Sequence, residues 1–218
     1  MGIRHNISKA TIRRLSLYLR EVNLRIKAGE VRMSSRELGR AVGVTDAQVR
    51  KDLACFGTFG HPGIGYLTAD LASRIREILG MDRTWNAALV GAGKIGQALM
   101  GYEGLVTDGF EIKAVFDEDP NVIGHELKGH RVRPMKDLDG LIRQRRIELG
   151  ILAVPANAAD EVADRLVRAG VSGILNFARS HLVLPTAVKL VNVDFTAALE
   201  ELAFEISFHN KGSIDEQT

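Results

Sequence analysis

The chain has 218 residues, 45% of them hydrophobic, which is enough to bury the core of one large or two small domains. No apolar run approaches twenty residues and the first nine residues are polar, so we expect no membrane span and no signal peptide. Cys55 is the single cysteine, which excludes an internal disulfide and fits a reducing compartment. These features predict a cytoplasmic protein with no membrane partner.

The net charge of +2 hides an uneven distribution along the chain. Residues 1–80 hold 14 lysines and arginines against 7 acidic residues, whereas the rest of the chain holds 15 against 20. A basic module therefore precedes an acidic one. Most basic faces are simply solvated, but a small basic domain favours a nucleic-acid partner.

The chain begins with the pattern of an amphipathic helix over residues 8–27. Its apolar positions share one stripe at helical spacing: Ile12, Leu15, Leu19, Val22 and Ile26. Gly29 ends this helix, and residues 31–33 are expected to form a short strand.

Two short helices follow, joined by a glycine-containing turn. A serine caps the first, over residues 35–42, and Gly43–Val44 makes the turn. Thr45–Gln48 has the pattern of a capping box that opens the second, in which Val49 and Leu53 face the core. This arrangement predicts a helix-turn-helix.

The second of these helices carries polar side chains where a recognition helix meets DNA. Arginine or lysine there can bond guanine, and glutamine can bond adenine, whereas capped helix ends contact phosphates. We therefore expect base contacts from Gln48, Arg50 and Lys51, and phosphate contacts from Ser35, Arg36 and Thr45.

Residues 56–66 contain four glycines among aromatic residues, which is typical of a wing, a tight hairpin beside a recognition helix. The alternative is a flexible interdomain loop, against which the aromatic side chains argue, although they could simply fill the small core. The wing residues expected to contact DNA are His61, Gly63 and Tyr66. A helix from Thr68, its cap, to Leu79 completes the first domain, residues 1–80.

A G-x-G-x-x-G sequence occupies residues 91–96, after a short apolar strand at 87–90 and before a helix expected over 95–106 with Ile95, Leu99 and Leu105 inward. In such a loop the first glycine permits a tight turn, the second lets the backbone approach a pyrophosphate, and the third lets the helix pack on the strand. The bare motif is a weak signal, but here it has its strand and helix. The expected cofactor contacts are Gly91, Ala92, Gly93, Lys94, Ile95 and Gly96.

A second strand, residues 112–116, ends at Asp117, which lies 21 residues after Gly96. A carboxylate at this spacing binds a ribose 2′-hydroxyl and would repel a 2′-phosphate. NAD(H) is therefore favoured over NADP(H).

The alternation of strands and helices continues to residue 194. We expect helices at 136–144 and 156–169 and strands at 149–154, 173–177 and 191–193. The strand at 149–154 is apolar throughout, as a parallel sheet with helices on both faces requires. The nicotinamide end of the cleft is expected at Val154, Pro155, Asn176 and Phe177, although Pro155 could equally be only a strand terminator. The fold class is thus α/β, with a winged helix-turn-helix before a Rossmann-type, doubly wound parallel sheet in residues 81–194.

The C-terminal helix, about Phe195 to Phe208, has two apolar stripes. One contains Phe195, Leu199, Leu202 and Ile206, and the nearly opposite one contains Ala197, Phe204 and Phe208. A helix that packs on one domain needs only one stripe. We therefore expect residues 195–218 to cross into a second subunit as a swapped helix, with burial inside one chain as the alternative.

Several of these segments together resemble the Rex family of bacterial redox-sensing transcriptional repressors. The resemblance covers about Ser8 to Phe208 and rests on Lys9–Arg20, Gln48–Leu53, Phe56–Gly57, Gly63–Tyr66, Ile174–Ala178 and Asn192–Phe195.

The resemblance implies a homodimer that binds a palindromic double-stranded operator when NADH is scarce and leaves it when NADH is abundant. NADH and NAD+ would be regulatory ligands, one to each subunit, and the C-terminal helix would pack on the partner's N-terminal domain. Phe195 would approach the partner's nicotinamide site, and Asp194 would bond Tyr102 in the NADH form or Arg20 in the DNA-binding form.

Two residues depart from the family's pattern. Many relatives have arginine or lysine just before Gly63, where this chain has Pro62, and relatives usually have proline where this chain has Arg179. The first puts the wing contacts in doubt, and the second puts the discrimination between NADH and NAD+ in doubt.

Two other functions remain open beside this one. An NAD-dependent oxidoreductase would need a general acid, yet no Tyr-x-x-x-Lys occurs, since Val106 stands four residues after Tyr102. A CoA-binding domain would leave Asp117 without its ribose role. The histidines also miss H-E-x-x-H spacing, so we expect neither catalytic residues nor a metal site.

Overall fold

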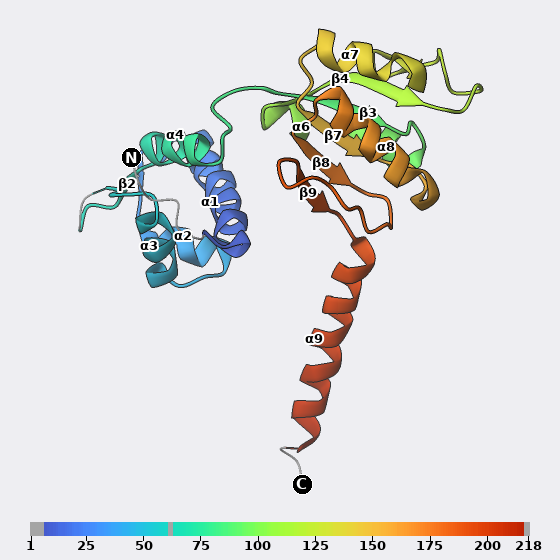
Figure 1. Cartoon of the computed structure of the whole chain (residues 1–218). Helices are drawn as coiled ribbons and strands as arrows, with labels where there is room; N and C mark the ends of the chain where they lie inside the picture. The colour runs from blue at the N-terminus through green and yellow to red at the C-terminus, as the bar shows by residue number, and fades with distance from the viewer. Residues whose placement is uncertain (1–6, 61–62, 216–218) are drawn as a thin grey trace. The chain divides into compact units, whose positions relative to one another are not determined.

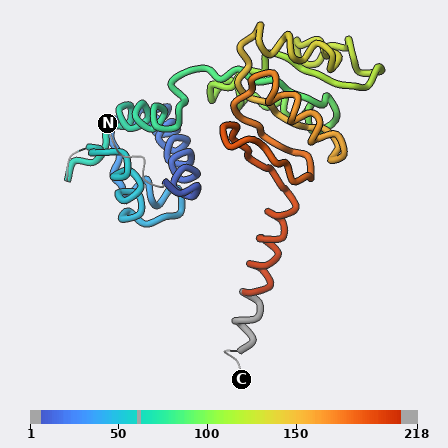
Figure 2. Tube along the Cα trace, in the orientation of Figure 1, coloured from blue at the N-terminus to red at the C-terminus, as the bar shows by residue number. Residues whose placement is uncertain are grey.

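The computed structural model describes residues 7–60 and 63–215, with side chains up to residue 208. The chain divides into two compact units, Met1–Thr84 and Trp85–Thr218. Figure 1 labels the helices and strands of each unit, and Figure 2 follows the chain through them. The three-segment division expected above places its first boundary at residue 80, four residues before the end of unit 1.

The described part of unit 1 has four helices and a two-stranded antiparallel sheet: α1 (Lys9–Lys27), β1 (Arg32–Met33), α2 (Ser35–Val42), α3 (Asp46–Ala54), β2 (Tyr66–Leu67) and α4 (Thr68–Ile78). Met33 of β1 lies opposite Tyr66 of β2. The buried side chains come from all these elements: Leu15, Tyr18, Leu19, Val22, Met33, Leu38, Val49, Leu53, Tyr66, Leu71, Ala72 and Ile75. The helix-turn-helix pair, α2 and α3, is therefore held by α1 and α4.

Side-chain caps start the first three helices, and those of α2 and α3 were predicted, whereas the Ser8 cap of α1 was not. Ser8 accepts from the Thr11 N–H at 3.0 Å, and Ser34 forms a capping box with Glu37. Thr45 accepts from the Gln48 N–H at 3.1 Å, but the Gln48 side chain donates to Asp52 instead of closing the predicted box. Gly43, at φ +77°, ends α2 in the left-handed conformation that glycine adopts without strain.

A buried carboxylate joins α3 to α1. Asp52, only 2% exposed, accepts two hydrogen bonds from the Arg14 guanidinium, at 2.6 and 2.7 Å, and one from the Tyr18 hydroxyl at 2.8 Å. Gln48 donates a further bond at 2.9 Å. Burial by itself raises the pKa of Asp52, but the bonds from Arg14, Tyr18 and Gln48 outweigh it and hold that pKa below its ordinary value.

Two details of unit 1 differ from expectation. The hairpin expected over residues 56–66 stays a prediction, because His61 and Pro62 lie outside the described residues. In the described part Gly60 lies close to the Gly65 carbonyl, and β2 pairs with β1. Thr68 does not cap α4, since its hydroxyl donates to the Glu30 carbonyl at 2.7 Å. Ile12 and Ile26 stay over one-third exposed, because the buried stripe of α1 runs through Tyr18 instead.

Unit 2 is a seven-stranded sheet with helices on both faces. Its strands are β3 (Trp85–Val90), β4 (Phe110–Asp117), β5 (Glu126–Leu127), β6 (His130–Pro134), β7 (Leu149–Leu152), β8 (Gly173–Asn176) and β9 (Lys189–Asn192). The order is β5-β6-β4-β3-β7-β8-β9, and all neighbours are parallel except β5 and β6. The helical elements are α5 (Lys94–Met100), α6 (Gly104–Thr107), a 3₁₀ turn at Met135–Asp137, α7 (Leu138–Gln144), α8 (Ala156–Ala169) and α9 (Phe195–Asp215).

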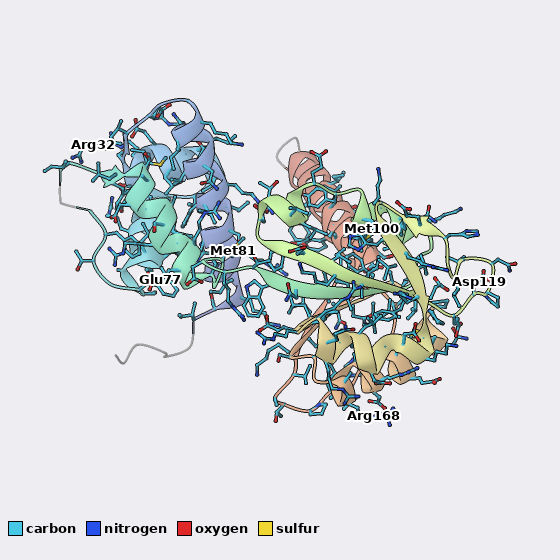
Figure 3. The ribbon with its side chains drawn as sticks, turned by 90° about the horizontal axis from the view of Figure 1, so that it is seen from above. Arg32, Glu77, Met81, Met100, Asp119 and Arg168 are labelled. Carbon is cyan, nitrogen blue, oxygen red and sulfur yellow. The ribbon has the colours of Figure 1, made fainter. Side chains whose placement is uncertain are left out.

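Alternate residues of β3 face opposite sides of this sheet. Ala88 and Val90 pack with α7 and α8, whereas Ala87 and Leu89 pack with side chains of α5 and α6. Figure 3 shows the side chains around the sheet. The α/β fold class with a doubly wound, mainly parallel sheet is confirmed. From β3 the chain first adds β4 and β6 on one side and later β7, β8 and β9 on the other, so the topological switch point lies between β3 and β7.

One prediction for unit 2 was wrong, and one strand of its sheet was not predicted. The helix expected over 95–106 is two helices, because Gly101 ends α5, and Ile95 is 43% exposed since Gly96 forms the face against the strand. Strand β6 gave no apolar run, because near the sheet edge only Val132 of its five residues is buried.

Helix α9 is exposed along both of its apolar stripes. Each of its large apolar side chains is more than half exposed over the described part of the helix: Phe195, Leu199, Leu202, Phe204, Ile206 and Phe208. No helix among the described residues is long and apolar enough to cross a bilayer. The described residues also include no cluster of three metal-binding side chains.

We expect Asp52→Ala to destabilise unit 1 by about 3 kcal/mol, since it leaves Arg14 and Tyr18 without their acceptor. Hydrogen exchange of the α1 and α3 amides in the full chain measures this. Glu21→Gln, which weakens the partly buried ion pair with Arg25 on the same helix, is the control and should change less. Equal exchange in both variants would contradict the role given to Asp52.

The same carboxylate predicts a pH dependence. Because the folded-state pKa of Asp52 is depressed, its stabilisation is fully present above the ordinary aspartate value of about 3.9 and is lost as the pH falls through the lower folded value. Acid should therefore accelerate exchange in α1 and α3 of the native chain. Asp52→Asn should show a smaller acid-induced change in the same amides.

Candidate functional site

The three glycines of the G-x-G-x-x-G sequence, which spans the end of β3 and the start of α5, occupy different environments. Gly91 has φ +99°, and a methyl group there would overlap the Ala153 carbonyl. A methyl group at Gly96 would overlap the Gly91 carbonyl, so this glycine lets α5 lie against the loop. At Gly93, by contrast, nothing lies within 4 Å of such a methyl group. The loop is thus closed on its protein side and open at Gly93, as a phosphate cradle requires.

Asp117 at the end of β4 holds the loop from the side. Its carboxylate accepts from the Ala92 N–H at 2.7 Å and from the Asp119 N–H at 2.9 Å. A carboxylate has about four acceptor positions, so two remain for the hydroxyls of a ribose. The predicted ribose ligand therefore lies beside the predicted phosphate loop.

A cavity of about 250 Å³ opens at this point of the sheet. Five predicted cofactor residues line it: Gly91, Gly93, Asp117, Val154 and Pro155. The volume is below the roughly 300–1,000 Å³ of typical ligand pockets, so it suits only part of a dinucleotide. Glu118 and Asp119 also line it, and Figure 3 labels Asp119 on the loop after β4. These two acids were missed, although their position directly after Asp117 could have indicated them.

The remaining predicted cofactor residues lie outside this cavity. Lys94 and Ile95 are exposed on α5. Asn176 is fully buried, and its amide bonds Asn192 at 3.0 Å and the Ala178 N–H at 2.9 Å, so it links β8 to β9 and shapes the following turn. Beyond that strand end the rings of Phe177 and Phe195 lie 6.2 Å apart.

The predicted switch residues come from both units: Arg20 from unit 1, and Tyr102 and Asp194 from unit 2. Asp194 caps α9 by accepting from the N–H groups of Thr196 and Ala197, at 2.8 and 3.2 Å. Tyr102 is 59% exposed and its ring lies over Gly104. Arg20 is exposed on α1.

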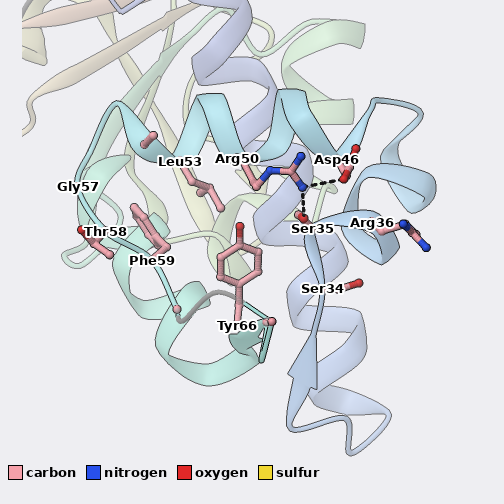
Figure 4. Close-up of a pocket in the computed structure, with 14 residues that line it drawn as sticks. Ser34, Ser35, Arg36, Asp46, Arg50, Leu53, Gly57, Thr58, Phe59 and Tyr66 are labelled. Atoms are coloured by element: carbon pink, nitrogen blue, oxygen red, sulfur yellow. Dashed lines mark hydrogen bonds and ion pairs between the residues drawn. The ribbon is translucent and has the colours of Figure 1, made fainter.

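Unit 1 has a larger groove, of about 770 Å³, between α2, α3 and the segment after α3 (Figure 4). It brings together the predicted DNA-binding residues Ser35, Arg36, Arg50, Gly63 and Tyr66. Three others lie outside it: Thr45 caps α3, Gln48 is bonded to Asp52, and Lys51 is exposed. His61 is not among the described residues.

Arg50 is the cation best fixed in this groove. It donates to Asp46 at 2.7 Å and to Ser35 at 3.1 Å, as the dashed lines of Figure 4 show. The Arg50 bond holds the pKa of Asp46 below its ordinary value. Tyr66 lines the groove with a side chain that is largely buried, unlike that of Arg50. This burial raises the pKa of the Tyr66 hydroxyl.

The opposite wall of the groove consists of residues 57–60, which sequence reasoning assigned only to the wing in general. Arg74 of α4 holds this wall: its guanidinium lies 4.0 Å from the Phe59 ring centroid and donates to the Thr58 carbonyl. No local pattern in the sequence pointed to Arg74, because its partners are fifteen or more residues away.

Two family models match parts of the chain. The model described as a CoA binding domain matches residues 82–180, and the model described as a putative DNA-binding protein N-terminus matches residues 6–54.

Relatives that match nearly the whole length of the chain include two that are both named redox-sensing transcriptional repressor Rex. The redox-sensing transcriptional repressor Rex of Syntrophomonas wolfei is 44% identical over 94% of this chain and 98% of its own, and that of Carboxydothermus hydrogenoformans is 46% identical over 92% and 96%.

Solved structures match over the same length. The Rex-family repressor RSP in complex with NAD+ and operator DNA is 35% identical and has a TM-score of 0.89 over 99% of both chains. RSP in complex with NADH has a TM-score of 0.86 over 96% of this chain and 99% of that chain. With this identity over nearly all of both units, the chain belongs to the Rex family of redox-sensing transcriptional repressors.

Proposed function

We propose that the protein is a homodimeric repressor that binds palindromic operator DNA through unit 1 and leaves it when NADH binds unit 2. One observation carries this proposal: the same chain has a groove beside a helix-turn-helix in unit 1 and a phosphate loop in unit 2 that is hydrogen-bonded to Asp117. Rex relatives match across both parts. We assign DNA binding to residues 1–80, the dinucleotide to 81–194 and dimer formation to 195–218.

The chemistry of the cavity favours NAD(H) as its ligand. Gly93 leaves space for a pyrophosphate, and Asp117 keeps free acceptor positions for ribose hydroxyls. Glu118 and Asp119 add negative charge to the lining, which disfavours the 2′-phosphate of NADP(H). RSP was solved with NADH and with NAD+, which supports the dinucleotide over the CoA that the domain model's description names.

The groove of unit 1 supports DNA binding by position and charge. Arg36 and Arg50 line it, and Lys51 stands exposed next to Arg50 on α3. We assign phosphate contacts to Ser35, Arg36 and Thr45 and base contacts to Arg50 and Lys51. Gln48 contributes less to base contacts than the sequence suggests, because its amide is already bonded to Asp52. Contacts from His61, Gly63 and Tyr66 complete the proposed surface.

A second copy of the chain is the occupant that α9 requires. Its six large apolar side chains are each more than half exposed, and exposed apolar surface on this scale marks an interaction site. In the proposed dimer Phe195 approaches the partner's nicotinamide, and Asp194 exchanges its helix-capping bonds for Tyr102 or Arg20.

NADH needs only a difference in affinity between two dimer states to act as the signal. The oxidised nicotinamide ring is positively charged and the reduced ring is neutral, so apolar neighbours such as Val154, Phe177 and Phe195 favour the reduced form. Tighter NADH binding to a dimer whose recognition helices are wrongly spaced then releases the operator.

This role is regulatory rather than catalytic. The relatives that match the whole chain are named as transcriptional repressors and not as enzymes. We place the protein in the cytoplasm, where its proposed operator and NADH both occur.

The central prediction concerns the response of DNA binding to the nicotinamide state. On a candidate palindrome, NADH should weaken operator binding by roughly tenfold or more, whereas NAD+ and CoA should not. A gel-shift titration with each ligand measures this. Operator binding that ignores NADH would contradict the sensor role, and a response to CoA alone would favour the CoA alternative.

A second prediction separates ligand binding from folding. Gly93→Ala should leave unit 2 as stable as before, because a methyl group meets nothing there, yet should weaken NADH binding by about tenfold or more by blocking the pyrophosphate. Thermal unfolding and calorimetric titration with NADH provide the two measurements. Gly140→Ala, another site open to a methyl group but far along the chain on α7, is the control for both. Unchanged NADH affinity in Gly93→Ala would show that the pyrophosphate lies elsewhere.

A further inference from the structure

One arginine of α4 contacts three consecutive residues of the segment after α3. The Arg74 Cζ lies 4.0 Å from the centroid of the Phe59 ring, and Nη1 donates to the Thr58 carbonyl. Its other terminal nitrogen lies 3.7 Å from the point where a methyl group on Gly57 would stand. The guanidinium is thus stacked, hydrogen-bonded and closely packed at once, which a lysine could not reproduce.

These three residues belong to the wall of the groove in unit 1. Gly57, Thr58, Phe59 and Gly60 all line it. Figure 4 shows Gly57, Thr58 and Phe59 on the side of the groove opposite Ser35 and Arg36. The width available to DNA in the groove therefore depends on where residues 57–60 lie.

No helix or strand holds the described part of this wall. Gly57 and Gly60 have φ values of +113° and +65°, and the described residues between α3 and β2 form no regular element apart from the single bridge at Gly65. Glycines lose more conformational entropy than other residues when they are ordered. Phe59 packs against the core of unit 1, and Gly60 lies close to the Gly65 carbonyl and the Tyr66 ring. Arg74 adds a contact from a rigid helix that fixes the Phe59 ring and the Thr58 carbonyl between these points.

We propose that Arg74 is a positioning residue for operator binding, which fixes the groove wall through Phe59 and Thr58 without touching DNA itself. Because only residues 79–84 separate α4 from β3, Arg74 also attaches the wall to the helix that leads into the dinucleotide-binding unit. The inference rests on the proposed function, since it concerns how the same surface is kept ready for DNA.

A direct contact with a DNA phosphate is the rival role for this arginine. The two roles differ in their salt dependence. Each phosphate contact adds about one to the steepness of the slope of log affinity against log salt concentration, so losing a phosphate contact makes that slope shallower. Losing a positioning residue instead lowers the affinity by the same factor at every salt concentration and leaves the slope unchanged.

The test compares two arginines of one helix in the full-length protein. Arg74→Gln removes the contacts, and Arg76→Gln removes the same charge from α4, where the described residues show no bond from the side chain to the groove wall. We expect Arg74→Gln to weaken operator binding roughly tenfold with an unchanged salt slope, and Arg76→Gln to weaken it less than about twofold. NADH affinity should be the same in both variants and the native protein.

A measurement without DNA tests the contact itself. Hydrogen exchange at residues 57–60 should accelerate in Arg74→Gln but not in Arg76→Gln, while the α1 and α3 amides stay protected in both. Phe59→Leu should weaken operator binding to a similar extent, and the double variant Phe59→Leu with Arg74→Gln should add little further loss.

Three results would overturn the inference: equal losses in Arg74→Gln and Arg76→Gln, a salt slope lowered by about one in Arg74→Gln alone, or faster exchange throughout unit 1. Failure of the proposed function looks different, because the native protein would then bind no operator. The exchange measurement would still decide whether Arg74 holds the wall.

Discussion

The buried carboxylate of Asp52 sets the geometry on which unit 1 depends. It accepts hydrogen bonds from Arg14 and Tyr18 of α1, so the rotation of α3 about its own axis is fixed by a helix outside the helix-turn-helix pair. With that rotation fixed, Val49 and Leu53 face the core and Arg50 and Lys51 face solvent. Gln48 has the right residue type for reading adenine, yet its amide completes the Asp52 cluster. The side chains available to DNA are therefore those that the interior does not use.

Unit 2 relies on a carboxylate in the same way, but with backbone as its partner. Asp117 accepts from the Ala92 N–H, so the residue expected to select the ribose also shapes the loop expected to hold the pyrophosphate. Gly91 and Gly96 make this possible because a side chain at either would overlap a carbonyl group. Gly91, Gly93 and Asp117 line part of the cavity, which explains why a short motif and its acid identified it.

The parts of the molecule that sequence reasoning predicted well depend on neighbours along the chain. The helix cap at Thr45, and the strand, glycine loop and acid of unit 2, all follow from local spacing. The contacts of Asp52 with Arg14 and of Arg74 with Phe59 join residues 38 and 15 positions apart, and no periodicity signals them. The break at Gly101 and strand β6, which has two arginines among its five residues, were missed because tertiary packing, not propensity, decides both.

Because both apolar stripes of α9 are exposed in the single chain, the stability of this helix in the proposed dimer depends on the concentration of the protein. A helix with apolar side chains on both faces gains most of its stability from whatever covers it, so in the proposed dimer folding of this arm and association are one equilibrium. Dilution then costs stability as well as assembly. In the proposed dimer, a fall in the concentration of the repressor therefore weakens operator binding by mass action, whatever the nicotinamide state. A newly made chain exposes the apolar side chains of α9 until it associates with a second copy.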